Sequence, residues 1–297
     1  MDLRGIIPPM TSPFAADGSL RLELVKPQVD WLIEQGVHGL AAGGSTGEGH
    51  TFEAEEFRDL VAATTEAAQG RVPVIAGIIV DSTRDAIRRG RMVAGMKVAA
   101  LQVTPVHYLF RPDDESMLRH FRAVAEETGL PVIIYNVVPW SYLSPQLLVR
   151  ILREVPGVSG VKQSAGDLKL FADLMLAAPP ESRIFSAVDA LLYSSFALGA
   201  RGAIAAILTA APRACVALWD AVRAGEHERA LGLHRKLLPL WNAMVGDNLP
   251  ACTKFAQAQQ GCDAGVPRQP MPAPGKEQQA AIRKALQDLG AKLKIAA

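Results

Sequence analysis

The feature that most constrains the fold is an alternation of short apolar runs with longer amphipathic segments, repeated eight times before residue 225. Apolar, β-branched runs of this length predict strands that are buried on both faces of a parallel sheet. Eight strand–helix units in series favour a closed (β/α)8 TIM barrel over a doubly wound sheet, which is the runner-up. The expected strands are residues 6–10, 39–42, 72–77, 99–103, 132–135, 158–162, 183–186 and 202–206.

The segments between these runs carry helix signals. Ser19 is expected to cap a first helix that runs to about Gln35, with Gly36 as its stop. The other barrel helices are expected near residues 51–70, 82–94, 113–128, 145–153, 168–178, 190–198 and 212–224. From residue 226 the pattern is all-helical, with helices expected at 226–245, 250–260 and 276–294. We therefore predict a barrel domain over 1–225 and a helical segment over 226–297 that packs on it.

Charge and cysteine content exclude several classes of protein. The formal net charge is +1 without a basic block, which argues against a nucleic-acid partner. The three cysteines lack zinc-site spacing and resemble reduced thiols. No secretory signal is visible, so a cytoplasmic location is expected. Residues 130–149 carry no charge, but three prolines and several polar residues argue against a membrane span.

Lys162 ends the sixth apolar run, directly before the small-residue stretch QSAG. In a barrel the carboxyl ends of the strands meet at one mouth, where active groups lie. Desolvation there disfavours the ammonium form, and a neutral lysine amine attacks carbonyl carbons. The alternative interpretation is a lysine that extends to solvent at a strand end.

Other strand ends point to the same mouth. After the second strand, adjacent glycines and small hydroxyl residues, Ser45 and Thr46 among them, could let backbone amides and hydroxyls converge on an anion. A plain tight turn is the alternative. Tyr135 ends the fifth strand, where a phenol can relay protons or pack in the core. His107 and Tyr108 follow the fourth strand. The remaining histidines show no metal-ligand spacing, and no metal site is predicted.

Three motifs in order carry a resemblance: GSTGE at 44–48, YN at 135–136 and GVKQ at 160–163. Together with PMTSPF at 9–14, VTP at 103–105 and QPMP at 269–272, they resemble the dihydrodipicolinate synthase / N-acetylneuraminate lyase family over almost the whole chain.

The resemblance implies a class I aldolase. Lys162 would form an imine with pyruvate or another 2-oxo acid, and Ser45 and Thr46 would hold the carboxylate. Tyr135 would shuttle the proton, and the protonated imine acts as the electron sink, so no cofactor is implied. The implied partners are the 2-oxo acid, an aldehyde and further copies of the chain in a homotetramer built as a dimer of dimers. Further residues are expected to bind the substrate: Gly44, Gly47, Tyr108, Trp140, Asp189 and Ile204.

The chain departs from the family at the positions that recognise the second substrate. Where the synthases carry a relay tyrosine, this chain has His107, with Tyr108 next. Trp140 stands in a segment without the synthases' arginine. Asp189 remains from the aspartate–glutamate pair of the sialic-acid lyases, but Ala190 follows it. A site without those donors favours a second substrate that is shorter or more apolar than sialic acid.

The leading hypothesis is therefore a carbon–carbon lyase or aldolase that acts on a 2-oxo acid through a lysine imine. The same imine can expel a β-hydroxyl, so a keto-deoxy sugar acid dehydratase is the nearest alternative. A 4-hydroxy-tetrahydrodipicolinate synthase comes third. From other classes, a non-catalytic binder of 2-oxo acids and a phosphate-binding barrel isomerase stay open.

Overall fold

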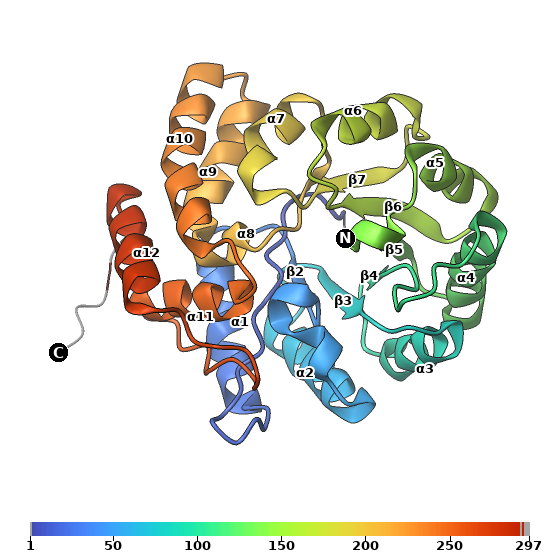
Figure 1. Ribbon diagram of the computed structural model, residues 1–297, viewed down its shortest axis with the longest axis horizontal. Helices are drawn as coiled ribbons and strands as arrows, with labels where there is room; N and C mark the ends of the chain where they lie inside the picture. The colour runs from blue at the N-terminus through green and yellow to red at the C-terminus, as the bar shows by residue number, and fades with distance from the viewer. Residues whose placement is uncertain (1, 292, 294–297) are drawn as a thin grey trace.

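The computed structural model describes residues 2–291 and 293, and eight parallel strands form one sheet within them (Figure 1). The hydrogen-bonded order is β1-β8-β7-β6-β5-β4-β3-β2, and a parallel bridge from Pro9 to Ala41 closes the ring. The predicted (β/α)8 barrel is thus confirmed. The strands are β1 (Gly5–Ile6), β2 (Leu40–Ala42), β3 (Val74–Ile78), β4 (Ala100–Val103), β5 (Val132–Asn136), β6 (Val158–Gln163), β7 (Arg183–Ser186) and β8 (Gly202–Ala203).

Two strands end several residues earlier than the sequence predicts. β1 ends at Ile6 rather than at residue 10, because the two prolines that follow have no N–H to give to a ladder. β8 ends at Ala203 rather than at residue 206. Beyond it the chain turns into α8 (Ile207–Ala210), whose first amide donates to the Asp189 carboxylate at 2.7 Å.

The barrel helices surround the strands (Figure 1). Ser82, Asp113 and Ser144 use their side-chain oxygens to cap the helices that follow them, which start at Thr83, Asp114 and Pro145. Ser19 was wrongly expected to cap the first helix: its amide and hydroxyl donate to Asp17, and the helix starts only at Val25 after a 3-10 turn. The helices are α1 (Val25–Glu34), α2 (Ala54–Ala68), α3 (Thr83–Val93), α4 (Asp114–Thr128), α5 (Pro145–Glu154), α6 (Leu168–Ala177), α7 (Leu192–Ala197) and α9 (Pro212–Arg223).

Side chains alternate between two hydrophobic layers, as the two-residue period of a strand requires. One layer fills the barrel interior, where Ile75, Ile133 and Phe185 meet. The other lies between strands and helices and holds their neighbours in sequence, such as Ala76 and Ile134. Both layers exclude water from the strands, and so they fix the positions of the side chains at the strand ends.

Three more helices follow the barrel: α10 (His227–Met244), α11 (Leu249–Gln259) and α12 (Lys276–Asp288). α10 packs on α9 and α12, and α11 packs on α8 and on the turn that contains Ser45. The predicted domain boundary at 225 and 226 falls between α9 and α10, and it stays a prediction. The predicted last helix extended to Lys294, which lies outside the described residues. Within the described residues, no helix is long and apolar enough to cross a membrane.

Candidate active site

Lys162 lies at the carboxyl end of β6, paired with Tyr135 of β5 and Phe185 of β7. The strand continues one residue further than predicted, to Gln163. Only 3% of Lys162 is exposed, and its Nζ lies 3.6 Å from the centroid of the Tyr135 ring. Burial lowers the pKa of the amine to about 7, against the opposing charge of Asp189. A large fraction of the amine is therefore neutral at neutral pH.

Asn136 and Gln163 continue β5 and β6 behind this lysine. The Asn136 side-chain amide donates from Nδ2 to Gln163 Oε1 at 3.2 Å and to the Leu143 carbonyl at 3.1 Å. Its Oδ1 accepts from the Leu143 backbone amide. Gln163 in turn accepts from the Ala165 amide. These bonds fix the two strand ends to the loops that follow, so that Tyr135 and Lys162 are held in one geometry.

Ser45 and Thr46 open a 3-10 turn (Ser45–Gly47) directly after β2. The Gly47 and Gly49 amides donate to the Gly44 carbonyl and close the turn. Gly47 has no room for a side chain, since a Cβ there would lie 2.7 Å from the Met10 carbonyl oxygen. Gly44 and Gly47 therefore shape the turn, and it is Ser45 and Thr46 that face the cavity.

Tyr135 connects the turn to the lysine. Its hydroxyl donates to Ser45 Oγ at 3.2 Å, and its ring lies under the Lys162 amine. Burial raises the pKa of the phenol to about 12, so the hydroxyl keeps its proton at neutral pH. The phenol is thus a hydrogen-bond donor that can pass a proton onward through Ser45.

Asp189 begins the 3-10 turn after β7 and is mostly buried. Its carboxylate accepts the Ile207 amide at 2.7 Å. Burial raises the pKa of this carboxyl to about 6, while the Ile207 amide and the charge of Lys162 act in the opposite direction. Asp189 and Lys162 therefore influence each other's charge without a direct ion pair.

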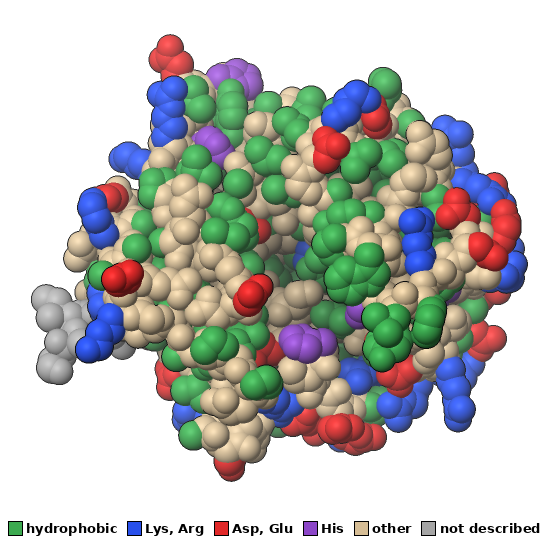
Figure 2. All heavy atoms as spheres, in the orientation of Figure 1, with side chains coloured by type: hydrophobic (Ala, Val, Ile, Leu, Met, Phe, Trp, Pro, Cys, Tyr) green, Lys and Arg blue, Asp and Glu red, His purple; other side chains and the backbone are tan. Residues whose placement is uncertain are grey.

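These side chains line one cavity of about 330 Å³ at the barrel mouth. Figure 2 shows the same face of the molecule, which is hollowed near its middle. The cavity contains six residues that the sequence predicted for the site: Ser45, Thr46, Tyr135, Lys162, Asp189 and Ile204.

Sequence reasoning missed the outer wall of the cavity. Trp241 of α10 and Leu249 and Pro250 of α11 line it, together with Val137 and Val188 from the barrel loops. Nothing in the helical periodicity marks which of these side chains faces the mouth, because that depends on how α10 and α11 pack.

The loop residues His107, Tyr108 and Trp140 do not line the cavity of this chain. The Trp140 indole donates to the His107 carbonyl at 2.9 Å, and His107 Nδ1 lies 3.0 Å from the Pro105 carbonyl oxygen. Tyr108 is 62% and Trp140 63% exposed. Their roles in proton transfer and substrate binding stay predictions.

Within the described residues, histidine, cysteine and carboxylate side chains form no group that could hold a metal ion. The polar groups of the cavity are instead three aliphatic hydroxyls, a phenol, a carboxyl, an indole and one amine. This set fits covalent chemistry on a carbonyl compound.

Comparisons with known proteins agree with this arrangement. The model of the "Dihydrodipicolinate synthetase family" matches residues 2–289. A 4-hydroxy-tetrahydrodipicolinate synthase of Ralstonia nicotianae is 34% identical, over 97% of this chain and 98% of that protein. The synthase of Archaeoglobus fulgidus is also 34% identical, over 96% and 98%.

Solved structures of similar proteins superpose on almost the whole chain. The chloride-inhibited dihydrodipicolinate synthase of Acinetobacter baumannii, complexed with pyruvate, has a TM-score of 0.92 at 28% identity and covers 98% of this chain and 100% of that one. The prophage protein YagE of E. coli K12, also in complex with pyruvate, has a TM-score of 0.93 at 25% identity, over 98% and 100%.

Proposed function

Since the chain belongs to the dihydrodipicolinate synthetase family, we propose that Lys162 is the residue through which it captures a 2-oxo acid such as pyruvate. The enzyme is a lyase of the Schiff-base-forming, class I aldolase type. One observation supports the assignment above the others: Lys162 presents a buried amine of lowered pKa to the cavity, next to a phenol that is bonded to the Ser45 hydroxyl.

In the proposed reaction the neutral Lys162 amine attacks the C2 carbonyl of the 2-oxo acid. The carbinolamine takes up a proton, delivered by Tyr135 through Ser45, and loses water to give a protonated imine. This imine withdraws electrons from C2 and so makes the C3 protons acidic. Loss of a proton from C3 gives an enamine that attacks an aldehyde, and the reverse sequence cleaves the product. Because the lysine imine is itself the electron sink, the proposed reaction calls for no cofactor.

Each remaining group of the inner cavity takes one role in this proposal. Ser45 and Thr46 hold the substrate carboxylate, and Tyr135 moves protons to and from the carbinolamine through Ser45. Ile204 forms the apolar floor beside the methyl carbon. Asp189 keeps a negative charge near the imine nitrogen.

The apolar part of the cavity lining indicates the class of the aldehyde. Besides Ile204 it consists of Val137, Ala187, Val188, Ala205, Ala206, Trp241, Leu249 and Pro250. Among the cavity-lining residues of the described chain, Lys162 is the sole cation. An aldehyde with a carboxylate would lose its hydration there without gaining a partner. We therefore propose a small, uncharged and largely apolar aldehyde, in preference to the 4-hydroxy-tetrahydrodipicolinate synthase and sugar-acid dehydratase alternatives.

Trapping with borohydride tests the first half of the proposal. The enzyme is incubated with pyruvate and reduced, and peptide mass spectrometry locates the adduct. We expect the adduct at Lys162 and none at Lys169, an exposed lysine that is ion-paired with Asp173. Absence of an adduct at Lys162 would sink the proposal for pyruvate, and longer 2-oxo acids would then be tried.

An aldehyde panel tests the second half. With pyruvate present, we expect butanal to be condensed more efficiently than glyceraldehyde or aspartate 4-semialdehyde. A preference for the charged semialdehyde would instead favour the synthase. The homotetramer and the cytoplasmic location stay predictions, and sedimentation of the purified chain checks the first of them.

A further inference from the structure

A buried ion pair joins α11 to the turn that contains Ser45 and Thr46. Lys254 of α11 donates from Nζ to Glu48 Oε1 at 2.6 Å and to the Val266 carbonyl at 2.7 Å. The Lys254 side chain is 3% exposed and that of Glu48 is 0% exposed. Buried charges of this kind occur where they are paired and hydrogen-bonded.

Glu48 is the residue that turns the chain out of the 3-10 turn. Its backbone is left-handed, with φ 56° and ψ 31°, which is uncommon for a residue with a side chain. Its amide donates to the Ser45 carbonyl at 3.0 Å, and its own carbonyl accepts the Thr51 amide and hydroxyl. The orientation of Glu48 therefore decides how the chain leaves the Ser45–Gly47 turn.

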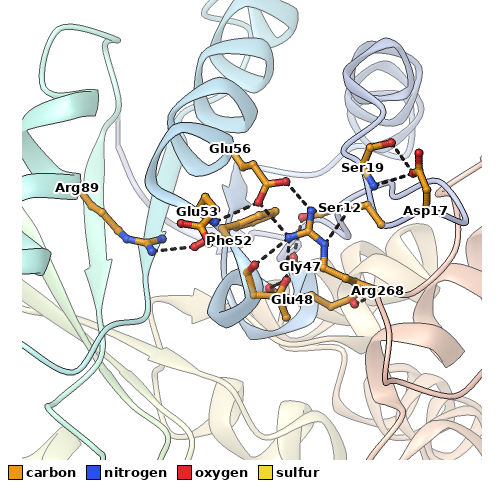
Figure 3. Close-up of polar contacts among 12 residues, drawn as sticks. Ser12, Asp17, Ser19, Gly47, Glu48, Phe52, Glu53, Glu56, Arg89 and Arg268 are labelled. Atoms are coloured by element: carbon orange, nitrogen blue, oxygen red, sulfur yellow. Dashed lines mark hydrogen bonds and ion pairs between the residues drawn. The ribbon is translucent and has the colours of Figure 1, made fainter.

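The second carboxylate oxygen of Glu48 is held from the other side. The Arg268 backbone amide donates to Glu48 Oε2 at 2.8 Å. The Arg268 side chain donates to the Gly18 and Thr51 carbonyls. It also pairs with Glu56, as Figure 3 shows. The segment near residue 268 is thus fixed to the start of α2, and Glu48 is held between two parts of the C-terminal region.

Phe14 packs against the charged groups around Glu48, and together Phe14, Glu48, Lys254 and Arg268 form one cluster. The Phe14 ring lies 4.7 Å from Lys254 Nζ and 4.1 Å from the centre of the Arg268 guanidinium. The ring excludes water from both cations, and it attracts them electrostatically. A loss of either cation would therefore loosen a packed unit.

None of these residues lines the cavity, whereas Ser45 and Thr46 do. We propose that Glu48 and Lys254 are positioning residues for the substrate carboxylate, which fix the Ser45–Thr46 turn from behind. This inference rests on the proposed function, because it assumes that the turn holds a carboxylate. An apolar pair could stabilise the same contact at least as well, but the hydrogen bonds of the ion pair fix one orientation of the Glu48 side chain. Hydroxyl groups that bind a small anion need that accuracy.

Two ketones that differ in the carboxylate alone test this role. Pyruvate and its neutral methyl ester are trapped on the enzyme with borohydride over a range of concentrations. In Lys254→Met we expect the half-saturating concentration of pyruvate to rise about tenfold, because hydrogen bonds to a charged group are weakened. The value for methyl pyruvate should stay within about twofold, since the ester makes no such bonds.

Three variants keep the result interpretable. Lys254→Arg retains a cation and should recover most of the selectivity for pyruvate over its ester. Glu48→Gln/Lys254→Met removes both buried charges, so it tests the same selectivity if the single variant fails to fold. Leu118→Ala removes a buried side chain of α4, outside the cavity and the cluster. It should lower the melting temperature without changing the selectivity.

The outcomes separate the two claims. A selective loss for pyruvate supports the positioning role. An equal loss for both ketones, or no loss for either, overturns it while the trapping of the wild-type enzyme leaves the proposed function standing. If the wild-type enzyme traps neither ketone, both claims fall for pyruvate.

Discussion

The molecule contains two lysines that are equally buried and differ in their partners. Lys162 and Lys254 are each 3% exposed, and burial lowers the pKa of both amines. Lys254 donates to the Glu48 carboxylate and to a carbonyl. Among the described residues, Lys162 has no hydrogen-bond or ion-pair partner for its Nζ. Burial alone therefore does not make a nucleophile: the partner decides between a fixed cation and a free amine.

The different partners follow from the places of the two lysines in the fold. Lys162 leaves a strand at the open mouth of the barrel, where the next atoms belong to a cavity. Lys254 lies in the middle of α11, pressed against the turn after β2. A carboxylate brought beside Lys162 would make it a second fixed cation, and removal of Glu48 would leave Lys254 buried without a partner.

The largest expected effect is the loss of turnover in the Lys162→Met variant. We expect a loss of at least about 10⁴-fold, because the covalent step has no other nucleophile. The fold should be retained, which circular dichroism would check. Lys169→Met, at an exposed and ion-paired lysine of α6, is the matched control and should stay active. Near-wild-type turnover in the Lys162 variant would contradict the proposed function.

The same variant should be more stable than the wild type at neutral pH. The pKa of Lys162 is about 7 in the fold and 10.5 for an unperturbed lysine. Between these values the unfolded chain binds more protons, so the free energy of unfolding of the wild type rises with pH across this window. The methionine variant has no amine at this position, so its free energy of unfolding lacks this pH dependence. Its advantage in urea unfolding should be greatest at and below pH 7 and should shrink as the pH approaches 10.5.

Lys254→Met should have the opposite effect on stability. It leaves the Glu48 carboxylate buried without its cation, and the free energy of unfolding should fall by about 3–5 kcal/mol. Adding Glu48→Gln should recover much of the loss, since neither charge then remains. Urea unfolding of the two variants measures both values. If Lys162→Met and Lys254→Met changed stability in the same direction, the contrast between the two lysines would be broken.

Much of the fold could be predicted from the sequence because the barrel depends on local patterns. Apolar runs, caps such as Ser82 and the order of units are all readable along the chain. The early end of β1 was readable in Pro8 and Pro9, which cannot donate to a ladder. The end of β8 could not be predicted, because it depends on the long-range hydrogen bond that the Ile207 amide donates to Asp189. The expected cap at Ser19 failed because Ser19 lies in a turn with Asp17, and the helix begins only at Val25 after a 3-10 turn.

The candidate site divides in the same way. Lys162, Tyr135 and Ser45 could be predicted because parallel strands bring their carboxyl ends together. Trp241 could not, since the packing of α10 decides which of its faces meets the mouth. The pair of Lys254 and Glu48 joins positions 206 residues apart, and neither residue shows in its neighbours that the other is near.

The smallest expected effect is the one that most sharpens the contrast, because it alters the charge near Lys162 without touching the amine. The Asp189 carboxylate favours the ammonium form and raises the pKa of Lys162 against the effect of burial. Its own pKa is about 6, so it is mostly ionised where the lysine titrates.

Asp189→Asn keeps an oxygen that can accept the Ile207 amide but removes the charge. The midpoint of the pH profile for pyruvate trapping should therefore move below 7, by about half a unit to one unit. Asp173→Asn, at an exposed carboxylate of α6, serves as the control and should leave the midpoint unchanged. A midpoint that stayed in place or moved upward in Asp189→Asn would mean that this carboxyl is already neutral when the lysine reacts.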